Sequence, residues 1–122
     1  MSIIEVHGRL GNTVLFYTLI MAGWSFWRYF RREGVSSSIW GATVIAEVMY
    51  LIQDLLGVFI WISGAGRLSG GMHILYGVVN ILILPAIFLY TRGDESPRTM
   101  LIYGAAYLFL VGTIYRSIAT AG

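Results

Sequence analysis

The 122-residue sequence contains no cysteine and no lysine, and only 11% of its residues are charged. The lack of cysteine excludes disulfides, thiolate metal sites and a cysteine nucleophile. A soluble domain of this size has about 25% charged residues. The low charge and a mean hydropathy of +0.75 therefore predict that much of the surface faces lipid. A net charge of +2, without a basic stripe, argues against nucleic-acid binding.

Catalytic sequence motifs are also missing. The chain has no nucleophile elbow, no phosphate-binding loop and no metallohydrolase motif. Gly8 and Gly11 stand close together but do not complete a nucleotide-binding fingerprint. We therefore do not expect a hydrolase or transferase that works on its own, and whether the chain contributes to an enzyme stays open.

Long uncharged runs are the strongest feature that is present. A helix that spans a membrane needs about 20 predominantly apolar residues. Between Glu33 and Arg67 the only charged residues are Glu47 and Asp54. Three further runs carry no charge, apart from a histidine in the second: Leu10 to Trp27, Leu68 to Thr91 and Thr99 to Tyr115. The sequence therefore predicts an all-α integral membrane protein with four transmembrane helices.

Capping residues predict where these helices begin. Ser2 and Glu5 form a capping box, and Ser96 with Pro97 has the pattern of a cap followed by the first helical residue. The connections are short, so neighbouring helices are expected to be antiparallel in an up-down-up-down bundle. We expect residues 1–122 to form a single transmembrane domain, with helices at about 3–32, 36–63, 70–91 and 97–119.

The arginines divide unequally between the two ends of the expected bundle. One end holds Arg28, Arg31, Arg32, Arg92 and Arg98. The other end holds Arg9, Arg67 and Arg116. Because cytoplasmic loops are enriched in arginine, the first end is expected in the cytoplasm. Both termini would then lie outside, with the protein in the inner membrane of a prokaryote.

The two histidines of the chain occur in similar segments. "HGRLG" places His7 four residues before Gly11, and "HILYG" places His73 four residues before Gly77. The offset of 66 residues (73 minus 7) is close to half the chain. This match predicts two related helical hairpins, as in an internal repeat. Each histidine would lie about 6 Å inside its helix, at 1.5 Å per residue.

In an up-down bundle the first and third helices are diagonal partners, so both histidines would face the core at one level. Two such imidazoles suit the two axial positions of a haem iron. Gly11 and Gly77 would leave room for the ring, and nearby arginines would meet the propionates. Those arginines are Arg9, Arg67 and Arg116.

The pattern of His7, Gly11, His73 and Gly77 in a four-helix layout resembles small membrane b-type cytochromes. That resemblance implies one haem b held between His7 and His73 and a role in electron transfer. Many such cytochromes hold two haems on four histidines, whereas this chain has ligands for one.

A different reading needs no cofactor. A histidine near a helix end can face the headgroups and water, and glycines in membrane helices commonly serve packing alone. The chain would then be a structural or accessory subunit of a larger respiratory or photosynthetic membrane complex. A metal site of the two histidines completed by Asp54 or Glu47 is a further alternative.

Glu47 and Asp54 lie seven residues apart and therefore on one face of the second helix. A carboxylate at membrane depth is costly unless it is paired or protonated. We expect Glu47 to be protonated and hydrogen-bonded, and Asp54 to pair with Arg116 or Arg9 or to accept from Asn80. This seam is either a proton or quinone site, or a polar contact between helices or subunits. The expected partners are the lipid bilayer, a quinone or redox partner, and further copies or subunits.

Overall fold

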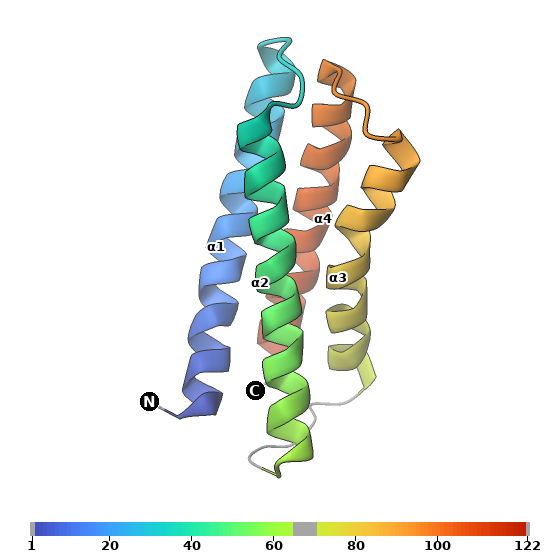
Figure 1. Ribbon diagram of the computed structural model, residues 1–122. Coiled ribbons are helices and arrows are strands. Elements are labelled where there is room, and N and C mark those ends of the chain that lie inside the picture. The colour runs from blue at the N-terminus through green and yellow to red at the C-terminus, as the bar shows by residue number, and fades with distance from the viewer. Residues whose placement is uncertain (1, 65–70, 122) are drawn as a thin grey trace.

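The protein is all α. The computed structural model describes residues 2–64 and 71–121, which form four helices (Figure 1). Their bounds are α1 Ile3–Phe30, α2 Ser37–Ile62, α3 Gly71–Thr91 and α4 Pro97–Ala121.

The helices pack as an up-down-up-down bundle, as the short connections predict. Each helix packs against the next one along the chain, and α4 closes the bundle against α1 (Figure 1). The α1–α4 interface is the most extensive and the α2–α3 interface the least. Consequently α1 and α3 lie diagonally across the bundle, and both termini lie at one end.

Local chemistry fixes several helix ends. Ser2 Oγ accepts a hydrogen bond from the backbone N–H of Glu5 at 3.1 Å, which satisfies one of the free amides at the start of α1. Ser36 Oγ does the same for Ile39 of α2 at 3.3 Å. Helix α1 ends at Phe30 rather than at the expected Arg32, because Arg32 adopts a left-handed backbone with φ of 58°.

The α1–α2 and α3–α4 turns pack directly on each other. The backbone N–H of Val35 donates to the carbonyl oxygen of Glu95 at 2.9 Å. A Cβ at position 34 would collide with that same carbonyl oxygen, so this approach requires Gly34. The two turns are thereby held together at the arginine-rich end of the bundle.

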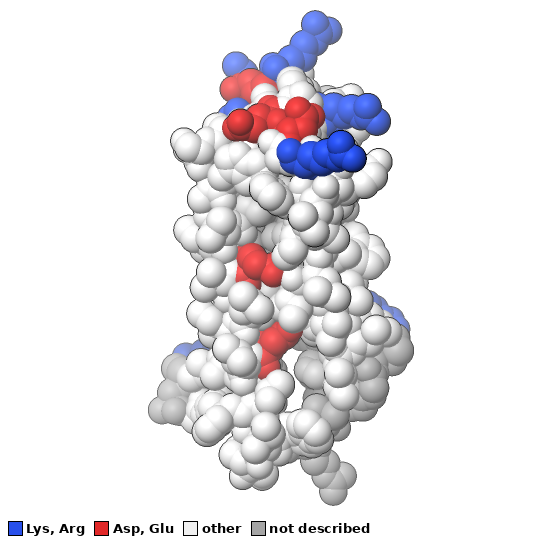
Figure 2. Space-filling view, turned by 45° about the vertical axis from the view of Figure 1, so that its right-hand side comes forward, with Lys and Arg blue, Asp and Glu red and all other residues white. Residues whose placement is uncertain are grey.

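Among the described residues, three helical segments are long and apolar enough to cross a membrane: Ser37–Ile62, His73–Thr91 and Pro97–Ala119. Helix α1, which carries Glu5, Arg9, Asn12 and Arg28, is not among them. In Figure 2 the charged atoms gather mainly at one end, above a largely uncharged body. This distribution indicates a bundle whose sides contact lipid.

Hydroxyl groups stabilise the centre of the bundle. Tyr50 and Tyr107 are buried, at 2% and 0% exposed. The Tyr50 hydroxyl is hydrogen-bonded to Thr18 Oγ1 of α1 at 2.7 Å, and the Tyr107 hydroxyl to Thr43 Oγ1 of α2 at 2.7 Å. Because a buried polar group without a partner is costly, these pairs also fix how the helices are rotated.

Candidate functional site

His7 lies on α1 with its ring against α2. A Cβ at Gly57 would lie 3.4 Å from Cε1 of His7, so the glycine leaves room for the imidazole. One turn earlier on α2, Gln53 Nε2 donates to the backbone oxygen of His7 at 2.7 Å. His7 Nδ1 and Gln53 Oε1 are both buried and have no hydrogen-bond partner within the part of the chain that the structure describes. Helix α2 therefore positions His7 and leaves a ring nitrogen uncommitted.

His73 is held from α4. Its Nδ1 atom lies 3.1 Å from Ser117 Oγ, and either atom can donate, depending on the tautomer. This contact engages Nδ1, so Nε2 is the ring nitrogen left for another partner. A second group that fixes the orientation of a histidine in this way is typical of metal ligands.

The two histidines lie on diagonal helices, as the sequence predicts. They lie on the diagonal helices α1 and α3, towards the end of the bundle that holds both termini. Both histidines lie beside the same stretch of α2: the His7 ring lies against Gly57, and Gly77, one turn after His73, lies against Asp54.

The expected glycines face side chains of α2 rather than open space. A Cβ at Gly11 would lie 3.2 Å from Gln53 Nε2 and 3.8 Å from the side chain of Ile118. A Cβ at Gly77 would lie 3.1 Å from Asp54 Oδ1. Gln53 and Asp54 therefore occupy the space beside the two glycines.

These contacts give a test of whether haem fits. The donor set fits, because two imidazoles on facing helices are all that a bis-histidine haem needs from the protein. Gly11, Gly57 and Gly77 are small, but Gln53, the His7 ring and Asp54 lie against them. Gln53 and Asp54 are flexible side chains, and both must turn aside to admit a ring.

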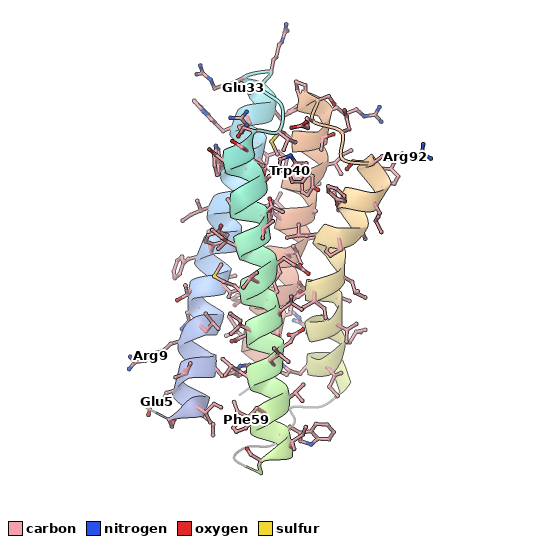
Figure 3. The ribbon with its side chains drawn as sticks, in the orientation of Figure 1. Glu5, Arg9, Glu33, Trp40, Phe59 and Arg92 are labelled. Atoms are coloured by element: carbon pink, nitrogen blue, oxygen red, sulfur yellow. The ribbon has the colours of Figure 1, made fainter. Side chains whose placement is uncertain are left out.

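The arginines expected at the propionates lie less favourably. Figure 3 shows the side chain of Arg9 extending away from the bundle. Arg116 is exposed on α4, and Arg67 lies outside the described residues. A propionate contact with Arg9 would require a different conformation of that side chain.

The hydrogen bonds of Glu47, Asp54 and Asn80 differ from those expected. Figure 2 shows acidic atoms part-way along the body, on the face where α2 and α3 meet. Glu47 Oε1 is buried with no hydrogen-bond partner among the described residues, so the expectation of a bonded Glu47 was wrong for this oxygen. Asp54 lies against Gly77, and Asn80 Oδ1 instead accepts from Thr113 Oγ1 at 2.5 Å.

The expected ion pair of Asp54 with Arg9 or Arg116 is not found among the described residues. The ion pairs seen there lie at the opposite end of the bundle and join Glu33 to Arg28 and Arg31. Asp54 therefore remains a carboxyl group at membrane depth beside a glycine.

Sequence reasoning missed Gln53, Gly57 and Ser117 as neighbours of the histidines. Gln53 and Gly57 lie one turn apart on α2, which is a weak local signal for a shared face. Ser117 is 44 residues from His73 in sequence, and no local pattern links the two.

In residues 2–64 and 71–121 no group of three or more histidine, aspartate or glutamate side chains is placed to hold a metal ion. The alternative of a metal site completed by Asp54 or Glu47 is therefore not supported. Comparison with protein-family models, curated proteins and solved structures finds no match for this chain.

Proposed function

We propose that the chain is an integral membrane electron-transfer protein, or a subunit of one, that holds one haem b between His7 and His73. The observation that supports the proposal is that these two residues, on diagonal helices, lie beside the same stretch of α2, where the His7 ring contacts Gly57 and Asp54 contacts Gly77. When bound, haem supplies reversible one-electron chemistry through its iron.

The neighbouring residues have defined tasks in this proposal. Ser117 engages Nδ1 of His73 and leaves Nε2 for the iron. Gln53 donates from Nε2 to the backbone oxygen of His7 and so fixes the backbone at this residue. Gly57 leaves room for the His7 ring. Such outer partners orient a ligand and raise its basicity.

We further propose that α1 crosses the membrane together with the other three helices, because it packs along both α2 and α4, which are long and apolar enough to span it (Figure 1). The arginine-rich turns would lie in the cytoplasm and both termini outside, in a prokaryotic inner membrane. Reporter fusions after Gly34 and Gly93 should give a cytoplasmic signal, and a fusion after Gly122 an external one. The same signal from all three fusions would contradict this topology.

A second candidate function is supported by the glycine contacts. Because Gln53 and Asp54 fill the space beside Gly11 and Gly77, the bundle is packed without any cofactor. The chain would then be a structural or accessory subunit of a larger respiratory or photosynthetic complex. The unpartnered Glu47 oxygen would face another subunit, a second copy or a quinone.

The haem content of the purified protein separates the two functions. The haem proposal predicts one haem per chain by the pyridine haemochromogen assay, after expression with ample haem. His7→Ala and His73→Ala should each reduce the content strongly. Gly8→Ala is a suitable control beside His7, because a Cβ there meets no atom of the described residues within 4 Å. A folded wild-type protein without haem would favour the accessory function.

A further inference from the structure

A groove lies at the α3–α4 turn, at the end of the bundle opposite the histidines. Its volume is about 380 Å³. We call it the turn groove; it is lined chiefly by Tyr90, Arg92, Asp94, Arg98, Thr99 and Ile102. The function proposed above makes no use of these residues.

Two arginines and one carboxylate, Asp94, line the turn groove, while the exposed Glu95 of the same turn lies outside the lining. Arg92 and Arg98 are both exposed, and neither forms an ion pair within the described ranges. Figure 3 shows Arg92 extending from the end of α3. The one carboxylate in the groove, Asp94, accepts hydrogen bonds from Ser96 Oγ at 2.5 Å and from Thr99 Oγ1 at 2.9 Å. Asp94 is thus committed to the turn, while both guanidinium groups remain available.

Two of the three arginines on the α1–α2 turn are already committed. Arg28 donates through Nε and Nη2 to the carbonyl oxygen of Gly34, at 2.8 and 2.5 Å. Arg31 Nε pairs with Glu33 at 3.0 Å. The turn groove therefore holds two arginines without an ion pair, whereas Arg32 is the one such arginine on the α1–α2 turn.

The turn groove also lies where a lipid headgroup would be. The apolar segments His73–Thr91 and Pro97–Ala119 both end at this turn, so the groove is at the level of the expected membrane surface. Tyr90 is 74% exposed, and tyrosine is enriched at this level of membrane proteins. A ligand with a phosphate group and acyl chains would match both the arginines and the apolar flank.

We propose that the turn groove binds the phosphate of an anionic phospholipid through Arg92 and Arg98, with Tyr90 and Ile102 against the acyl chains. Two guanidinium groups against one committed carboxylate favour a lipid with net negative charge over a zwitterionic one. The proposal depends on the membrane location and not on haem.

The test is native mass spectrometry of the full chain released from micelles with phosphatidylglycerol or phosphatidylcholine. We expect preferential retention of phosphatidylglycerol. Each arginine near an anionic surface contributes about five-fold in affinity, so R92Q with R98Q should weaken retention roughly 25-fold. Arg92→Lys with Arg98→Lys keeps the charge and should retain most of the binding.

Arg32→Gln is the matched control for Arg92→Gln. Like Arg92, Arg32 is exposed and has a positive φ, but it lies on the α1–α2 turn. Equal loss in this control would show general charge attraction and overturn the proposal. Equal retention of phosphatidylcholine would overturn it as well. Displacement of phosphatidylglycerol by millimolar inorganic phosphate would show a free-anion site instead of a lipid site. Helical circular dichroism confirms folding, and the single variants serve if the double variant does not fold.

Discussion

His73 Nδ1 lies 3.1 Å from the hydroxyl oxygen of Ser117, across the α3–α4 interface. This contact restricts rotation of the imidazole and favours one tautomer. Because the other nitrogen is then free for a ligand, the pair links the packing of α4 to any chemistry at His73. Removing the hydroxyl should therefore alter the histidine without removing it.

Ser117→Ala is predicted to weaken haem binding by about 10–100-fold, which is the usual effect of losing an outer partner of a ligating histidine. The remaining haem should show shifted electron paramagnetic resonance g-values, because the His73 plane is less restrained. Ser117→Thr keeps the hydroxyl and should restore the wild-type spectrum. Unchanged affinity and g-values in Ser117→Ala would show that Ser117 only packs. Haem-free protein labelled with ¹⁵N-histidine gives an independent readout, since the His73 tautomer should change.

Gly57→Leu is predicted to displace the His7 ring, because even a Cβ at this position approaches Cε1 to 3.4 Å. Overpacking of this kind costs about 1–3 kcal/mol, so both stability and haem content should fall. Gly41→Leu is the control on the same helix, since a Cβ there meets none of the described residues within 4 Å. Haem titration and unfolding in mixed micelles measure the two effects. Equal behaviour of the two variants would contradict the placement of His7 against α2.

Gly104→Ala is predicted to destabilise the α1–α4 interface. A Cβ there would lie 2.9 Å from Cε1 of Phe26, and relieving this clash costs about 1–3 kcal/mol. Gly112→Ala lies on the same helix in open space among the described residues. It should be neutral or stabilising by up to about 1 kcal/mol, because alanine favours helix more than glycine. Denaturant unfolding of both variants in micelles checks the sign of each effect.

The α3–α4 turn is predicted to loosen in acid. Hydrogen bonds from the Ser96 and Thr99 side chains lower the pKa of Asp94 below its usual 3.8. A lowered folded-state pKa stabilises the folded turn above pH 3.8, and this contribution is lost as the pH falls through the lower folded value. The protection factor of the Thr99 amide, which corrects for the intrinsic pH dependence of exchange, should therefore fall below pH 3.8. In Asp94→Asn the protection factor should be lower already at neutral pH and change little with pH, whereas an unchanged acid response in this variant would contradict the assignment.

The helices themselves could be predicted from the sequence, because uncharged runs and caps are local signals. The ends of α2, α3 and α4 lie within about two residues of the expected ranges, and the caps at Ser2 and Ser36 form hydrogen bonds. Helix α1 ends at Phe30 rather than at the expected Arg32, which adopts a left-handed backbone.

The surroundings of the histidines could be predicted only in part. Helix order alone placed His7 and His73 on diagonal helices. The contacts of Gln53 and Ser117 depend on the rotation and axial shift of each helix, which buried pairs such as Tyr50 with Thr18 help to fix. Glu47 was expected to find a hydrogen-bond partner, but its position on the loosely packed α2–α3 face left Oε1 without one among the described residues.

Joint binding of one haem by His7 and His73 is tested by low-temperature electron paramagnetic resonance of the oxidised protein, purified from haem-supplied cells. We expect a low-spin signal in the wild type, replaced in His73→Ala by a high-spin signal or by loss of haem. A wild-type protein that is helical and folded but colourless, or whose low-spin signal survives both His7→Ala and His73→Ala, would contradict it.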